Sequence, residues 1–284
     1  MILCGSISKR RGHSTAGFPF STSRRYQRIG TASSDAVSSF WNDVFCAVDE
    51  SINIYPLGDR AVTVEWGRAP DPLVHARLIS LHTHLCRHPF PGYVESVPAY
   101  VSLTIIYDPL DPILFARACG ESVSEQVRRE VLESLSVMES VPADRMPVTI
   151  PVCYDRDFGP DLSEVANMCG LSVDEVIDIH VSGVYRVYMI GFVPGFPYLG
   201  MMDPRLDVSR KSSPRMQVAP GSVAMAGRQT GIYPLTVPGG WQIIGRTPIR
   251  VFDPCESNPF LLKPGMDVRF ERIDRGLFEK LTIQ

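Results

Sequence analysis

Glycine, proline and aromatic residues crowd the segment from residue 191 to residue 247, which contains GFVPGFPYLG and then APGSVAMAGRQTGIYPLTVPGGWQIIGRTP. From Ser222 onward the chain divides into short runs separated by Gly/Pro turns: SVAMAG, GIYPLTV, WQIIGR, IRVF and DVRFERI. That spacing predicts the strands of a β-barrel or sandwich. Glycine and aromatic residues in such density are also typical of a site where the backbone approaches a ligand.

The same part of the chain is basic. From Val208 to Phe252 there is no Asp, Glu, His or Cys, and the stretch contains six cations: Arg210, Lys211, Arg215, Arg228, Arg246 and Arg250. Cations without a counter-charge indicate an anionic ligand, such as a carboxylate, a phosphate or a nucleotide. Six solvated surface cations are the alternative interpretation.

The basic stretch contains no nucleophile paired with a base, although its hydroxyl groups can stabilise an anionic transition state. Acid–base groups would come from Asp203, Asp207 or His180, or from another polypeptide. We therefore favour a half-site that is completed by a partner protein. His180 ends a predicted short helix, where it is either a capping residue or a ligand-facing acid or base.

Neutral and aromatic side chains complete the candidate pocket. Tyr198 and Trp241 are candidates for its apolar walls, with a purely structural role as the alternative. Gln229 and Thr230 offer donors and acceptors that orient a small amide or lactam.

Length, charge and cysteine content exclude several classes of protein. A chain of 284 residues is long enough for two domains, and its net charge of −3 argues against nucleic-acid binding. No transmembrane segment is predicted, because glycine and proline interrupt the uncharged run 187–202. The seven cysteines form no C-x-x-C pair, so we expect free thiols, and no metal site is predicted.

Three segments are expected along the chain. Residues 1–50 are rich in Ser, Thr and Arg and read as a disordered tail, a mis-set start or a targeting extension. Residues 51–150 alternate strands with helices, notably 72–87 and 125–135, and Val148–Val152 is expected to close this unit; the pattern predicts an α+β sandwich of ferredoxin-like type. Residues 151–284 hold two short helices, with capping boxes at Asp161/Glu164 and Ser172/Glu175, followed by the all-β unit.

Several segments of the sequence carry a resemblance to a known family. VCYDRDFGPDL, His180, YRVYMIGFVPGFPYLG and GRQTGIYPLTVPGGWQIIGRTP resemble the family of 5-oxoprolinase B subunits, also called KipI or allophanate hydrolase subunit 1, of the carboxyltransferase-domain C/D type. YPLGDRAVTVEWG and PAYVSLTIIYDP are similar to it as well, so the resemblance spans residues 52–275.

The resemblance implies a fold and a set of site residues. It implies an N-terminal α+β domain, a C-terminal cyclophilin-like β-barrel, and partners that are the A-type and C-type subunits of 5-oxoprolinase. We take as catalytic candidates His180, Arg215, Gln229, Thr230 and Arg246. The candidates for binding substrate or nucleotide are Pro194, Gly195, Phe196, Tyr198, Arg228, Tyr233, Pro238, Gly239, Gly240 and Trp241.

The function implied is ATP-dependent hydrolysis of the lactam 5-oxoproline to glutamate by a heteromeric enzyme, with ATP and Mg²⁺ bound at an interface between its chains. Phosphorylation would activate the lactam carbonyl before water attacks it. The alternatives are a histidine-kinase inhibitor and a component of a biotin-dependent urea or amide carboxyltransferase or allophanate hydrolase. We expect the protein in the cytoplasm, or in a mitochondrion or other organelle if residues 1–50 are a transit peptide.

Overall fold

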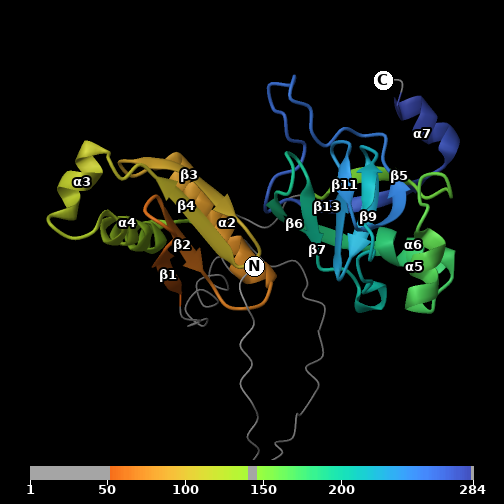
Figure 1. Cartoon of the computed structure of the whole chain (residues 1–284), viewed down its shortest axis with the longest axis horizontal. Helices are drawn as coiled ribbons and strands as arrows, with labels where there is room; N and C mark the ends of the chain where they lie inside the picture. Colours follow the sequence, from red (N-terminus) through yellow and green to blue (C-terminus); the bar gives the residue numbers. More distant parts are fainter. Residues whose placement is uncertain (1–51, 140–145, 283–284) are drawn as a thin grey trace, which may run out of the picture. The chain divides into compact units, whose positions relative to one another are not determined.

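The structure is a computed structural model that describes residues 52–139 and 146–282. The expected N-terminal extension, residues 1–50, lies outside the described residues. The described chain contains a four-stranded sheet with helices and a closed barrel (Figure 1).

The four-stranded sheet is antiparallel, with the strand order β1-β2-β4-β3. Its strands are β1 (Asn53–Pro56), β2 (Ala61–Glu65), β3 (Tyr93–Pro98) and β4 (Ser102–Tyr107). Helix α2 (Pro72–Arg87) packs over β3 and β4, and α4 (Val123–Val137) packs over β1 and β2. Apolar side chains of both helices and of the sheet bury each other as one core: Leu78, Leu81, Leu85, Val64, Leu103, Ile105, Val127 and Val131.

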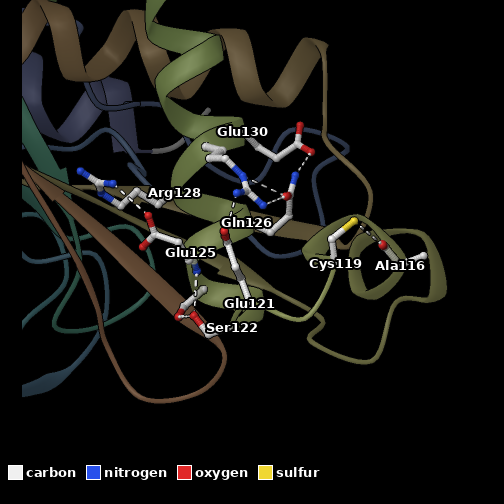
Figure 2. A network of polar contacts seen from close by, with 10 residues as sticks. Ala116, Cys119, Glu121, Ser122, Glu125, Gln126, Arg128 and Glu130 are labelled. Atoms are coloured by element: carbon white, nitrogen blue, oxygen red, sulfur yellow. Dashed lines mark hydrogen bonds and ion pairs between the residues drawn. The ribbon is translucent and has the colours of Figure 1, made fainter.

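Helix α2 coincides with the predicted span 72–87 because its signals are local. Asp71 caps its first turn by accepting from the backbone N–H groups of Leu73 and Val74, at 2.7 and 3.1 Å, and Pro72 opens the helix. Helix α4 runs two residues beyond the predicted 125–135 at each end. Figure 2 shows its first turns, where Ser122 accepts from the Glu125 N–H and Arg128 pairs with Glu125 at 3.0 Å.

The ferredoxin-like assignment is wrong in topology. A ferredoxin-like unit runs β-α-β-β-α-β. Here two strands precede α2, two follow it, and two helices, α3 (Pro112–Ala118) and α4, come last. The strand predicted at 148–152 exists as β5 (Val148–Cys153), but it belongs to the barrel and not to this sheet.

Seven strands close the barrel in the order β10-β7-β6-β13-β5-β12-β9. They are β6 (Val184–Ile190), β7 (Pro197–Gly200), β9 (Ser222–Ala226), β10 (Gln229–Ile232), β12 (Gln242–Arg246), β13 (Asp267–Ile273) and β5. The pair β5–β13 is parallel, and the other barrel pairs are antiparallel. A separate ribbon pairs β8 (Arg215–Val218) with β11 (Val237–Gly239).

The predicted all-β unit is therefore confirmed as a barrel, but two of the predicted strands differ. The run GIYPLTV is not one strand: Gly231 and Ile232 end β10, residues 233–236 form no strand, and Val237 begins β11 outside the barrel. The run IRVF forms no strand, and Phe252 makes only an isolated bridge to Phe260. Two strands N-terminal to Ser222, β6 and β7, and the earlier β5 also enter the barrel wall.

Three helices pack on barrel strands: α5 (Leu162–Cys169) on β12, α6 (Val173–Ser182) on β13 and α7 (Arg275–Thr282) on β5. The capping box of Ser172 and Glu175 is present, whereas the one expected at Asp161 is wrong, because the Asp161 side chain makes no cap hydrogen bond. The cysteines that the structure describes are free thiols. Within residues 52–139 and 146–282, no helix is long and apolar enough to cross a membrane.

Candidate functional site

Five aromatic rings form a cluster with Phe196, immediately before β7, in its centre. Phe196 is 2% exposed and meets Phe192, Tyr198, Tyr233 and Trp241 edge to face, with ring centroids 5.0 to 5.8 Å apart. Tyr198 and Trp241 also touch each other, at 5.8 Å between centroids. Such edge-to-face pairs fix ring orientations, so the cluster forms a rigid wall.

This wall borders a hollow of about 280 Å³, which we call the aromatic cavity. It is lined by Phe192, Phe196, Tyr198, Arg210, Lys211, Pro214, Tyr233, Pro238, Gly239, Gly240 and Trp241. Seven of these lining residues are sequence-predicted site residues. The lining contains no carboxylate, imidazole or thiol, so its own side chains offer binding groups and no general base at neutral pH.

Backbone geometry explains the glycines of this region. A Cβ atom on Gly239 would overlap the Tyr233 hydroxyl, so glycine is required where β11 passes that ring. Gly195 has φ +82° and turns the chain into β7, with Pro194 beside it. Pro194 and Gly195 therefore shape the approach to Phe196 but do not line the cavity themselves.

Two cations that are adjacent in the sequence, Arg210 and Lys211, line the cavity. The Arg210 guanidinium carbon lies 6.0 Å from the centre of the Trp241 ring, at the outer limit of a cation–π contact. Within the described residues, no carboxylate lies within ion-pair distance of Arg210. The Lys211 backbone N–H donates to Gly240 O at 2.7 Å, which holds the two lining segments together.

A buried carboxylate, that of Asp161, forms ion pairs with Arg215 and Lys211. Asp161, just before α5, is 3% exposed and accepts hydrogen bonds from Arg215 Nη2 at 2.6 Å and Lys211 Nζ at 3.1 Å. Its second oxygen accepts from the Ile243 N–H at 2.7 Å. Burial alone would raise the pKa of Asp161, but the bonds from Arg215, Ile243 and Lys211 hold that pKa below its ordinary value.

The remaining cations of the basic stretch lie apart from the aromatic cavity. Arg228 donates to Met202 O at 3.2 Å, and Arg250 pairs with Asp253 at 3.1 Å. Arg246 donates to Pro220 O at 2.9 Å and lines a different hollow, of about 230 Å³. Trp241 immediately precedes β12 and Arg246 ends it, so strand geometry separates them by roughly 16 Å.

His180 and Thr230 lie inside the protein, each 0% exposed. The Thr230 hydroxyl donates to Ala224 O at 3.1 Å, so it accepts from His180 Nε2, 3.0 Å away. His180 Nδ1 then accepts from the Tyr154 hydroxyl at 2.8 Å, which requires a neutral ring. Burial accordingly lowers the pKa of His180 to about 3. Gln229, at the start of β10, is half-buried and is not among the residues that line the aromatic cavity.

The structure thus brings together part of the expected site. Phe196, Tyr198, Tyr233, Trp241 and the segment 238–240 share one cavity, whereas His180, Thr230, Arg228 and Arg246 lie outside it. Arg215 is paired with Asp161 and does not line the cavity. Arg210 and Phe192 line the cavity but are not among the predicted site residues, and Asp161 is predicted only as a helix cap. The signal for Arg210 was present, because it opens the acid-free stretch beside Lys211.

Known proteins match this chain over most of its described length. Residues 52–262 match the family model described as carboxyltransferase domain, subdomain C and D. The 5-oxoprolinase B subunit of Bacillus subtilis (strain 168) is 46% identical over 221 residues, 78% of this chain and 92% of that protein. The 5-oxoprolinase B subunit of Escherichia coli O157:H7 is 38% identical over 216 residues, 76% of this chain and 94% of that protein.

A solved structure has a similar fold and a related sequence. The crystal structure of TTHA0988 matches with a TM-score of 0.65 and 39% identity, covering 76% of this chain. The match covers 40% of the crystallised chain, so this chain spans about two fifths of that polypeptide.

Proposed function

Because this chain belongs to the family of carboxyltransferase domains, subdomain C and D, together with proteins named as B subunits of 5-oxoprolinase, we propose that it is the B subunit of a 5-oxoprolinase. In this proposal the enzyme hydrolyses the lactam 5-oxoproline to glutamate with ATP. The chain acts within a complex that also contains subunits of the A and C types.

The aromatic cavity is the observation that carries the proposal for this chain. Its volume of about 280 Å³ lies just below the range of about 300–1,000 Å³ that is typical of drug-sized sites, which suits a small lactam acid. The Arg210 guanidinium would hold the substrate carboxylate, since a guanidinium binds a carboxylate through two parallel hydrogen bonds. Tyr198 and Trp241, which touch each other, would form adjoining apolar walls against the ring of the lactam.

The same cavity is too small for a whole nucleoside triphosphate, and its lining contains no carboxylate to hold Mg²⁺. We therefore assign no ATP contact to it and derive no step through ATP on this chain. A base is missing from the lining as well. These two gaps support a reaction centre that is completed by a partner protein, with this chain binding and orienting the lactam.

The test measures glutamate release from 5-oxoproline and ATP by the complex assembled with its A-type and C-type subunits. Omission of this chain is expected to abolish release. Arg210→Ala is expected to raise KM for 5-oxoproline roughly 10- to 100-fold, the range expected when a hydrogen bond to a charged group is lost. Arg250→Ala is the matched control, because this exposed arginine of the same stretch lies outside the aromatic cavity and, among the described residues, pairs with Asp253. Full activity without this chain would refute the proposal.

A second candidate function follows from the description of the family model. A carboxyltransferase component would transfer a carboxyl group to a urea-like or amide substrate from a biotinylated partner. The same assembled complex distinguishes the two reactions. Activity that requires bicarbonate and a biotin carrier, and that releases no glutamate, would favour the carboxyltransferase.

A further inference from the structure

The Asp161 carboxylate accepts hydrogen bonds from three residues that are distant from it in the sequence, which distinguishes it from the other carboxylates near the basic stretch. It joins the start of α5 to Lys211 beside the aromatic cavity, to Arg215 of β8 and to the backbone of Ile243 in β12. The paired residues are 50, 54 and 82 positions away. A buried carboxylate with three hydrogen bonds to two cations and a backbone N–H is held in one geometry.

Because Asp161 forms ion pairs with two of the cations near the cavity, it also determines which cation can bind an anionic ligand. Lys211 Nζ is bound to Asp161 and, at 3.0 Å, to Glu164. Arg215 has Asp161 as its ion-pair partner, and its Nη1 atom is buried without a hydrogen-bond partner in the described chain. Arg210 has no carboxylate partner among the described residues and lines the cavity. The three cations and the two carboxylates together leave one net positive charge.

We propose that Asp161 is a positioning and specificity-determining residue that matches the aromatic cavity to ligands with a single negative charge. It holds Lys211 and Arg215 in place and, together with Glu164, balances their two positive charges, so that Arg210 provides the net charge that meets the ligand. The identity of the ligand as 5-oxoproline, a monoanion, rests on the proposed function. The role of Asp161 rests on the contacts above.

The consequence is a change of charge selectivity when Asp161 is neutralised. Asp161→Asn leaves two net positive charges beside the cavity, which favours a dianion over a monoanion. One additional unit charge on the order of 10 Å from the ligand, at an effective dielectric constant of about 20, corresponds to roughly tenfold in affinity. A purely structural role would weaken both kinds of anion equally.

The experiment titrates the assembled complex with 5-oxoproline and with glutarate, a dianion of similar size, by isothermal titration calorimetry. The ratio of the two dissociation constants in Asp161→Asn is expected to shift roughly tenfold toward glutarate. Asp253→Asn is the matched control, since Asp253 also accepts from an arginine and a backbone N–H but lies outside the cavity lining. Asp161→Glu, which keeps the charge, is expected to retain the wild-type ratio.

Lys211→Gln is expected to have the opposite effect, because it removes a cation beside the cavity. The ratio of the two dissociation constants is expected to shift toward 5-oxoproline, the monoanion. An unchanged ratio in both Asp161→Asn and Lys211→Gln would overturn the proposal. Equal weakening of both anions in Asp161→Asn would overturn it as well.

A measurement without any ligand separates this inference from the proposed function. Acylation of Lys211 by a succinimidyl ester, followed by peptide mass spectrometry, is expected to be several-fold faster in Asp161→Asn than in wild type. The reason is that the carboxylates of Glu164 and Asp161 raise the pKa of the Lys211 amine. An unchanged rate would overturn the role of Asp161. Failure of the wild-type complex to bind 5-oxoproline would instead remove the proposed function, and the labelling rate would still decide the role of Asp161.

Discussion

Mild acid is expected to destabilise this protein, because two histidines are buried in their neutral form. His180 and His75 are each 0% exposed, and burial lowers their pKa values from 6.5 to about 3 and about 4. His180 lies within the chain of hydrogen bonds from Tyr154 to Ala224 O, and His75 Nε2 lies 2.8 Å from Tyr188 O. Neither ring can gain a proton without losing these contacts or burying a charge.

The direction and magnitude of the change in unfolding free energy with pH follow from the linkage between proton binding and folding. The unfolded chain binds a proton at each histidine below pH 6.5, whereas the folded chain does not do so until the folded pKa is reached. Stability is therefore complete above pH 6.5 and falls as pH decreases toward 4. At pH 5 each histidine costs about 2 kcal/mol, so the pair removes about 4 kcal/mol of a total that is typically about 5–15 kcal/mol.

The assay is urea unfolding at pH 8, 7, 6 and 5 and constant ionic strength. His180→Gln retains a polar side chain but does not titrate. It is expected to lower stability at pH 8 and to lose only about 2 kcal/mol between pH 8 and pH 5, against about 4 kcal/mol for wild type. Ser182→Ala, an exposed and non-titrating position at the end of α6, is the control and is expected to follow the wild-type profile. Equal slopes for wild type and His180→Gln would refute the assignment of His180 as a neutral buried ring.

Three further substitutions test the description of the fold and the cavity. Gly239→Ala would place a Cβ atom 2.7 Å from Tyr233 Cζ, so we expect a loss of about 1–3 kcal/mol in unfolding free energy and weaker 5-oxoproline binding, measured by urea unfolding and calorimetry. Phe196→Ala would remove the centre of the aromatic cluster and is expected to cost about 3–5 kcal/mol by urea unfolding, whereas Phe196→Leu should cost less. Ser172→Ala would remove half of the capping box of α6 and is expected to cost about 1 kcal/mol by urea unfolding, with exposed Ser182→Ala as the control; no loss would contradict the capping role.

Local signals in the sequence predicted local structure well. Helix α2 begins and ends where Asp71, Pro72 and Pro89 place it, and the capping box of α6 was readable from Ser172 and Glu175. The helix α3 was not predicted, although Asp111 followed by Pro112 repeats the Asp71-Pro72 pair that begins α2. Strand β3 was not predicted because it follows Pro91-Gly92 and ends in proline, which reads as a loop.

The assignment of strands to sheets and the pairing of charged residues could not be predicted from local sequence signals, because both depend on contacts between distant parts of the chain. Nothing in the run 148–153 distinguishes a strand of the first sheet from a strand of the barrel, since its partner β13 lies more than a hundred residues later. The basic stretch lacked a counter-charge only within its own sequence, because Asp161 precedes Lys211 by 50 residues. The aromatic wall was predicted more fully than the polar groups, since glycine, proline and aromatic residues constrain their immediate neighbourhood.

The parallel pairing of β5 with β13 has a consequence for how the protein is made. These strands connect the first and last parts of the barrel sequence, so ring closure needs contacts between Val148 and Val268. During synthesis, β5 and β6 keep open edges until residues 267–273 have left the ribosome, and exposed strand edges invite pairing with other chains. The nascent protein therefore depends on residues 267–273 to close the barrel, and termination before β13 would leave a curved sheet with two unpaired strand edges.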